Sequence, residues 1–143
     1  MSQRDKIHAQ VDMYLEDSFP DKVNAGDDWL LNTNPFIVAR LAPTGLDLES
    51  FPRFYFVLEA ELIDGVKETP FFNKLLAHLN GKYYYLKLVA LQSKNRVSMW
   101  AKVEIPADDL QKREVIFAIF MILGALDILP DRIKRALKTK SLG

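Results

Sequence analysis

The sequence contains no cysteine. This absence excludes disulfide bonds, cysteine-ligated zinc and thiol chemistry, and it is compatible with a reducing compartment. Histidine is also scarce, because His8 and His78 are the only two in the chain. Neither has a second imidazole or a group of carboxylates at coordinating spacing, so we predict no metal site and no cofactor.

Catalytic motifs are absent as well. The chain has no glycine-rich phosphate loop, no Gly-x-Ser-x-Gly motif and no nucleophile beside a base. Glu59 and Glu61 share one face of an expected strand, but alternating carboxylates near lysines are typical of a solvated strand face. We therefore predict that the protein is not an enzyme.

Long hydrophobic runs are missing too. The longest apolar run, residues 115–126, is shorter than the roughly 20 residues that a membrane helix needs. The N-terminal stretch mixes acids and bases with isolated apolar residues, unlike a secretory signal. We therefore expect a cytoplasmic protein. The 143 residues, 49% of them hydrophobic, suffice for one core, so residues 1–143 are predicted to form a single domain.

The formal net charge is zero, but the charges are distributed unevenly. Residues 1–28 carry seven acids and three bases, whereas residues 111–143 carry seven bases and three acids. The basic C-terminal tail can contact phosphates of nucleic acid or anionic lipid, or it can be a solvated face that balances the acidic N-terminal helix. The second interpretation is favoured, so nucleic acid is not the expected partner. The basic residues of this tail are Arg132, Lys134, Arg135, Lys138 and Lys140.

The chain is organised around a helix predicted from Asp108 to Leu129. Asp108 is the expected N-cap, and Gln111, three residues on, completes a capping-box pattern. The apolar run that follows predicts a helix buried on nearly all sides, or a core helix with one face in a dimer interface. We expect a break near Pro130 and then a short basic helix over residues 131–138.

Two further helices are predicted. Apolar residues recur at three- and four-residue steps between Arg4 and Phe19, which is typical of an amphipathic helix. Thr69 as N-cap, Pro70 at the first helical position and Gly81 just past the end bracket the second helix. Its apolar face consists of Phe71, Phe72, Leu75, Leu76 and Leu79.

Five strands are predicted. The third of them, Pro52–Leu62, alternates apolar residues with others, which indicates a strand with one buried face, and Asp64 and Gly65 are expected to end it. Residues 42–50 are expected to form a loop. The other strands are expected at Trp29–Leu31, Phe36–Leu41, Tyr84–Gln92 and Val97–Ile105.

The last two strands are predicted to form a hairpin around Lys94 and Asn95. A two-residue loop makes four facing pairs apolar, and a slip by one residue would move them to the solvent side, so the pattern fixes the register. Leu88 and Val103 should therefore be fully buried. The four pairs are Ala90 with Met99, Leu88 with Ala101, Leu86 with Val103 and Tyr84 with Ile105.

The outer face of the predicted sheet carries apolar side chains where polar ones are expected. The hairpin register places Trp100 opposite Val89, and Lys87 opposite Lys102. An apolar outer face often marks a partner surface, although a helix of the same chain or a second copy can also cover it. The candidate partner surface consists of Tyr55, Val57, Tyr85, Val89, Leu91 and Trp100.

The order of predicted elements is α-β-β-β-α-β-β-α followed by the short basic helix, which makes the fold α+β, with an antiparallel sheet of about five strands packed with helices. The helix ending in Leu75–Gly81, the hairpin over Tyr83–Ile105, and the final helix from Asp108 to Asp127–Pro130 resemble the type III secretion chaperone-like fold, and within it the YbjN group of bacterial proteins. The resemblance implies a small, often dimeric, chaperone-like or peptide-binding module without known chemistry. The loop at residues 43–50 and the basic tail depart from that pattern.

We therefore predict a non-catalytic protein- or peptide-binding module that acts as a homodimer and holds a segment of another protein. The alternative is a structural or regulatory subunit of a larger assembly. An enzyme of unrecognised type, or a binder of nucleic acid or anionic lipid through the basic tail, is less favoured. A client binder should keep a hydrophobic groove when purified, whereas binding to phosphates through the tail should collapse between low and moderate salt.

Overall fold

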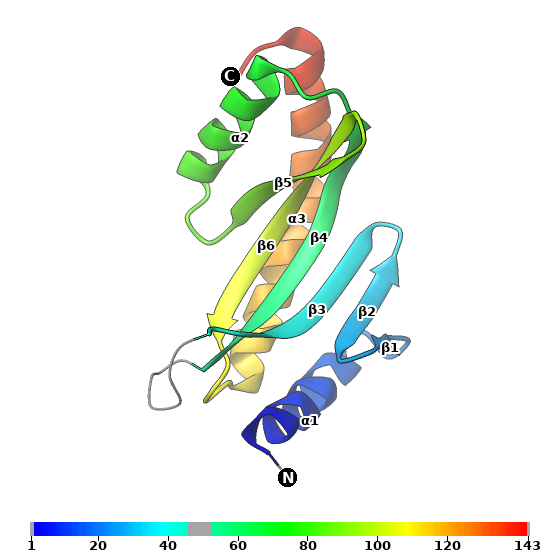
Figure 1. The fold of residues 1–143 in the computed structure, drawn as a ribbon, viewed down its shortest axis with the longest axis vertical. Coiled ribbons are helices and arrows are strands. Elements are labelled where there is room, and N and C mark those ends of the chain that lie inside the picture. Colours follow the sequence, from blue (N-terminus) through cyan, green and yellow to red (C-terminus); the bar gives the residue numbers. More distant parts are fainter. Residues whose placement is uncertain (1, 46–52, 143) are drawn as a thin grey trace. The chain divides into compact units, whose positions relative to one another are not determined.

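The computed structural model describes residues 2–45 and 53–142 (Figure 1). The helices in these residues are α1 (Gln3–Glu16), α2 (Pro70–Lys82) and α3 (Lys112–Thr139). The strands are β1 (Val23–Ala25), β2 (Asp28–Thr33), β3 (Phe36–Pro43), β4 (Phe54–Val66), β5 (Lys87–Ser93) and β6 (Arg96–Pro106).

The strands form one antiparallel sheet in the order β1-β2-β3-β4-β6-β5, packed with the helices (Figure 1). The predicted α+β class is therefore confirmed. The sequence did not indicate the short, exposed strand β1. Strand β4 also continues past Asp64 and Gly65 to Val66, so the predicted end of this strand is wrong. The predicted loop over residues 42–50 begins too early, because Ala42 and Pro43 belong to β3. Residues 46–50 of that loop, and Pro52, lie outside the described residues.

By its internal contacts the chain divides into two compact units. The first unit comprises Met1–Leu58 and Glu104–Phe120, and the second unit comprises Glu59–Val103 and Met121–Gly143. Strands β4 and β6 and helix α3 contribute residues to both units. The candidate site described below belongs entirely to the second unit.

The core of the first unit is built around Trp29 of β2, which is fully buried. The indole stacks on the His8 imidazole with 4.1 Å between ring centroids, and its Nε1–H donates to Asp12 Oδ1 at 3.0 Å. Both partners come from α1, so a stack and a hydrogen bond together fix this helix to the strand. The buried apolar residues of α1 are Ile7, Val11 and Leu15.

Asp108 does not cap α3, although the sequence predicts that it does. Its carboxylate instead accepts backbone N–H bonds from Arg53, at 2.9 Å to Oδ1 and 3.0 Å to Oδ2, and from Phe54, at 3.0 Å to Oδ1. Helix α3 begins later, where Glu114 Oε1 accepts the Gln111 backbone N–H at 2.9 Å. The Asp108 carboxylate, which the local sequence pattern predicts as the N-cap of the helix, therefore binds the N–H groups at the start of β4 instead.

The predicted break near Pro130 is also wrong, because α3 continues through this residue to Thr139. Proline removes one helical hydrogen bond and crowds the preceding turn. On either side of it, Leu129 and Ile133 are fully buried. Their burial offsets the lost hydrogen bond, so the main helix and the short basic helix expected after it are one element.

Helix α3 is not buried on nearly all sides, contrary to the prediction. Its apolar run includes Phe117, Phe120 and Leu123, which are 54%, 67% and 42% exposed. A run of apolar residues does not specify which face of the helix is covered, because packing decides that. The alternative of a dimer interface on one face stays a prediction. The buried face consists of Val115, Ala118, Ile119, Ile122, Ala125, Leu129 and Ile133.

The hairpin of β5 and β6 has the predicted register. Leu88 and Val103 are buried, as expected from the pattern. Strand β5 begins only at Lys87, however, so the expected pairs of Leu86 and Tyr84 fall outside the strand, and Tyr84 is 91% exposed. The confirmed pairs are Ala90 with Met99, Leu88 with Ala101, Val89 with Trp100 and Lys87 with Lys102.

Helix α2 begins where the sequence predicts. Thr69 is the N-cap, its Oγ1 accepts the Phe72 backbone N–H at 3.1 Å, and Pro70 occupies the first turn. The predicted end is slightly early, because Gly81 lies inside the helix, which ends at Lys82.

Asn80 ties the C-terminal end of α2 to β5. Its amide oxygen accepts the Leu88 backbone N–H at 2.7 Å, and its amide nitrogen donates to the Leu88 carbonyl at 2.8 Å. One side chain thus satisfies both main-chain groups of a strand residue. The tie fixes the position of α2 in the second unit and, with it, one wall of the candidate site.

Candidate functional site: a groove between two helices

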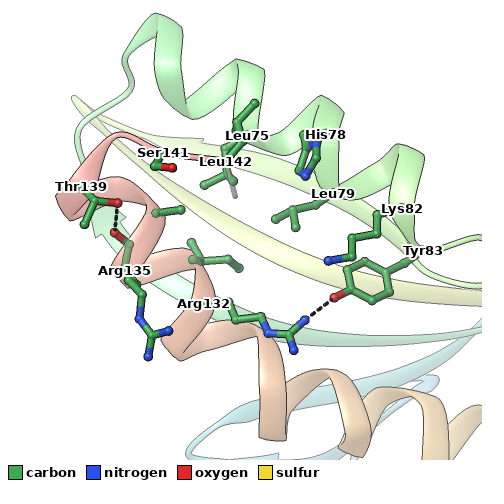
Figure 2. Close-up of a pocket in the computed structure, with 12 residues that line it drawn as sticks. Leu75, His78, Leu79, Lys82, Tyr83, Arg132, Arg135, Thr139, Ser141 and Leu142 are labelled. Atoms are coloured by element: carbon green, nitrogen blue, oxygen red, sulfur yellow. Dashed lines mark hydrogen bonds between the residues drawn. The ribbon is translucent and has the colours of Figure 1, made fainter.

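A groove of about 510 Å³ lies between α2 and the C-terminal part of α3 in the second unit (Figure 2). This volume falls within the range typical of small-ligand sites. The residues that line the groove are Leu75, His78, Leu79, Lys82, Tyr83, Arg132, Ile133, Arg135, Ala136, Thr139, Ser141 and Leu142.

The wall formed by α2 follows from the helical period. Leu75, His78, Leu79 and Lys82 occupy positions i, i+3, i+4 and i+7, so their side chains share one face of the helix. Leu75 and Leu79 are buried at the base of this wall, whereas His78 and Lys82 are exposed. The wall therefore changes from apolar to polar toward the solvent.

The opposite wall comes from the last turns of α3 and the residues after it. Ile133 is fully buried and offers no surface, so the half-buried Ala136 supplies the apolar floor on this side of the groove. After the helix, Lys140 adopts φ of +53°, in the left-handed region, and the chain reverses. The reversal places Ser141 and Leu142 among the lining residues, where Leu142 is half-buried (Figure 2).

One end of the groove is cationic. Arg132 Nη1 donates to the Tyr83 hydroxyl oxygen at 3.0 Å, and Lys82 Nζ lies 5.7 Å from the centre of the Tyr83 ring (Figure 2). Figure 2 shows that the Arg135 guanidinium points away from α2, so it adds charge outside the groove. The described residues that line the groove include no carboxylate. The arrangement suits an anionic group at this end and an apolar group over the floor.

The six residues of the predicted partner surface belong to different units and differ in exposure. Tyr85 and Leu91 are 72% and 47% exposed, and Val89 and Trp100 are half-buried cross-strand partners in the second unit. Tyr55 and Val57 belong to the first unit. Tyr55 is half-buried, and Val57 is 2% exposed and has no surface to offer a partner.

The basic tail is divided by the structure. Arg132 and Arg135 line the groove, whereas Lys134 and Lys138 are exposed on α3 and are not among the lining residues. Lys140 forms the left-handed turn. The tail is therefore part helix, part groove wall, rather than one continuous basic surface.

The two histidines, His8 and His78, lie in different surroundings. His8 stacks on Trp29, and its Nε2 lies 3.0 Å from the Asp27 carbonyl oxygen, whereas His78 lines the groove. Across residues 2–45 and 53–142, no three histidine, cysteine or acidic side chains are grouped so that they could hold a metal ion. No helix in the same residues is long and apolar enough to span a membrane.

Sequence reasoning missed the groove. It assigned Leu75 and Leu79 to an apolar helix face and Arg132 and Arg135 to a basic tail, but it did not place the two groups together. Only the fold brings α2 and the end of α3 side by side. The available signal was the spacing of Ile133 and Ala136 within the basic stretch, which marks an amphipathic helix face. No family model, curated protein or solved structure matches the chain.

Proposed function

We propose that the protein is a non-catalytic, chaperone-like module that binds a segment of another protein in the groove between α2 and α3. The observation that carries this proposal is the apolar floor of the groove beside its cationic end. An apolar side chain of the bound segment packs on Ala136 and Leu142, the half-buried apolar residues among those that line the groove. The cations at the rim favour a partner of acidic character, because no carboxylate lines the groove in the described residues.

Two features support a peptide over a rigid protein surface as the occupant. The groove has a volume of about 510 Å³, so it accepts a few side chains rather than a whole interface. Its apolar part is also continuous with exposed polar groups, as in grooves that hold an amphipathic segment by a few anchors. The fit of such a segment depends on the shape of the floor.

The proposal is tested by filling the floor. Ala136→Leu places a larger side chain in the groove, and Ala77→Leu places the same group on exposed α2 surface outside the lining residues. The probe is a short capped peptide with two leucines one helical turn apart and an adjacent glutamate, labelled with an uncharged dye. We expect Ala136→Leu to weaken binding about tenfold or more, as for loss of one buried leucine, and Ala77→Leu to leave it unchanged.

Fluorescence anisotropy gives the two affinities, and circular dichroism confirms that both variants are folded. Equal binding by both variants would place the peptide elsewhere and remove the groove from the proposal. No binding by the wild-type protein would remove peptide binding itself.

The proposal includes a homodimer in the cytoplasm, in line with the resemblance described above. The side chain of Leu91 is 47% exposed and can take part in self-association. Sedimentation equilibrium of the wild-type protein and of Leu91→Ser measures the self-association. A monomer in both cases would contradict the homodimer. The alternative of a structural subunit predicts instead a protein that is poorly soluble without its assembly.

A further inference from the structure

We propose that the segment bound in the groove carries a carboxylate side chain, which is held where Lys82, Tyr83 and Arg132 meet. This inference rests on the proposed function and names the chemistry of the partner. It concerns one end of the groove and one functional group, so it can fail while peptide binding stands.

The first step of the argument is the hydrogen bond between Arg132 and Tyr83. Arg132 Nη1 donates to the phenolic oxygen at 3.0 Å, so that oxygen is used as an acceptor. A phenol also has one O–H to donate. Since the guanidinium holds the oxygen from one side, the O–H is left to donate to a group on another side, and an acceptor without hydrogens suits it.

The second step is the charge around this hydroxyl. Lys82 Nζ lies 5.7 Å from the Tyr83 ring centre, and the Arg132 guanidinium has further N–H groups beyond the one given to Tyr83. Lys82 also stands in the last turn of α2, where a cation is already favoured by the helix dipole. Figure 2 shows the ends of all three side chains gathered at the same end of the groove.

The third step is the choice of ligand group. A carboxylate is an acceptor with two oxygens and about four lone-pair directions, so it can take the Tyr83 O–H, an Arg132 N–H and the Lys82 ammonium together. A carboxamide of the same shape presents an NH₂ to one of these donors and loses that bond. Glutamate and glutamine therefore differ at this site by charge and by one acceptor, with the apolar anchor unchanged.

The test compares two peptides that differ only in this group. The first is the leucine peptide with its glutamate, and the second has glutamine in that place. We expect the wild-type protein to bind the glutamate peptide about three- to fivefold more tightly, the scale of a solvent-exposed ion pair. Arg132→Gln should remove this preference, because it weakens binding of the glutamate peptide more than binding of the glutamine peptide.

Two further variants separate local recognition from general charge. Lys134→Gln removes one positive charge from the same part of α3, but Lys134 is exposed and outside the lining residues, so the preference should persist. Tyr83→Phe removes the hydroxyl without changing the charge and should reduce the preference about twofold. Melting curves by circular dichroism establish that each variant is folded.

Each result bears on the inference. Equal binding of the two peptides to the wild-type protein overturns it and leaves peptide binding standing, whereas absence of binding by both overturns it together with the proposed function. Loss of the preference in Lys134→Gln to the same extent as in Arg132→Gln also overturns it. The inference is also overturned if the protein binds phosphatidylserine vesicles or a thymidine oligonucleotide more tightly than the glutamate peptide, and if Arg132→Gln and Lys134→Gln weaken that binding equally. That pattern indicates phosphate binding by a basic surface that extends beyond the groove.

Discussion

In each unit a polar side chain holds the main chain of a strand residue by hydrogen bonds, and the two side chains, Asp108 and Asn80, differ in charge. In the first unit the Asp108 carboxylate accepts the backbone N–H groups of Arg53 and Phe54. In the second unit the Asn80 amide both accepts from and donates to Leu88. The side chain in each case matches what the strand leaves open: two donors for a carboxylate, one donor and one acceptor for an amide.

The difference teaches that these positions are not interchangeable. A carboxylate at position 80 would meet the Leu88 carbonyl with a negative oxygen, and an amide at position 108 would turn NH₂ toward a backbone N–H. Both ties also join residues that are distant in sequence or separated by a loop. Their contribution to stability can therefore be measured by substitutions that leave local helix and strand propensities nearly unchanged.

The largest effect is expected from the apolar side chain of the residue that Asn80 holds. Leu88→Ala should lower the free energy of unfolding by about 2–5 kcal/mol, because the side chain is 2% exposed and leaves a cavity. Leu91→Ala on the same strand is the control, since Leu91 is 47% exposed. Urea titration followed by circular dichroism measures both. A loss below about 0.5 kcal/mol for Leu88→Ala would contradict the assigned core.

The next effect tests the charged tie. Asp108→Ala should cost about 2 kcal/mol, because two backbone N–H groups lose a charged acceptor. Asp108→Asn should cost about half as much, since one amide oxygen can still accept. Asp109→Ala, at the exposed neighbouring position, provides the control. Equal stability of Asp108→Ala and Asp109→Ala in denaturant titration would show that the tie contributes nothing.

The neutral tie should contribute less. Asn80→Ala should cost about 1 kcal/mol relative to Asn73→Ala, an exposed site on the same helix where the same substitution changes helix propensity equally. Asn80→Asp should cost more than Asn80→Ala because of the repulsion described above. Thermal melts of the three variants give the order, and a reversed order of Asp and Ala at position 80 would refute the donor role of the amide.

The smallest effect on stability is expected at Glu61, whose surroundings disfavour the ionised carboxylate. Burial, and then the charge of Asp64, raise the pKa of Glu61 above its ordinary value. The folded state therefore binds the proton more tightly than the unfolded state, so stability falls as pH rises from the ordinary pKa through the raised one. Glu61→Gln should be more stable at neutral pH by less than about 0.5 kcal/mol, because solvent screens a partly exposed group.

The pH profile of unfolding distinguishes this cause from a general change in packing. The gain in Glu61→Gln should disappear at a pH below the ordinary glutamate pKa, where both proteins carry a neutral group. A gain that is the same at all pH values would point to packing instead of charge.

The features that depend on neighbouring residues, or on a complete apolar pattern, could be predicted from the sequence. Thr69 and Pro70 announce α2 because capping depends on neighbours in the chain. The hairpin register follows from facing apolar pairs, of which Leu88 with Ala101 is one. Strand β1 escaped prediction because its residues are all exposed and show no alternation.

Features that depend on distant residues could not be predicted. Asp108 looks like an N-cap until its long-range partners are known. Pro130 looks like a break until the burial of Ile133 beyond it is known. The groove needs both α2 and the reversal at Lys140, and the sequence gives no sign that these segments meet.

The tie at Asn80 has one more consequence, for the behaviour of the protein in concentrated solution. Strand β5 is the last strand in the sheet order, so one side of it has no neighbouring strand in the described residues. A bare strand edge invites pairing with other chains and can seed aggregates. At Leu88 the amide of Asn80 takes the hydrogen bonds that an incoming strand would need. Asn80, which positions one wall of the groove, therefore also prevents another chain from pairing with β5 at Leu88.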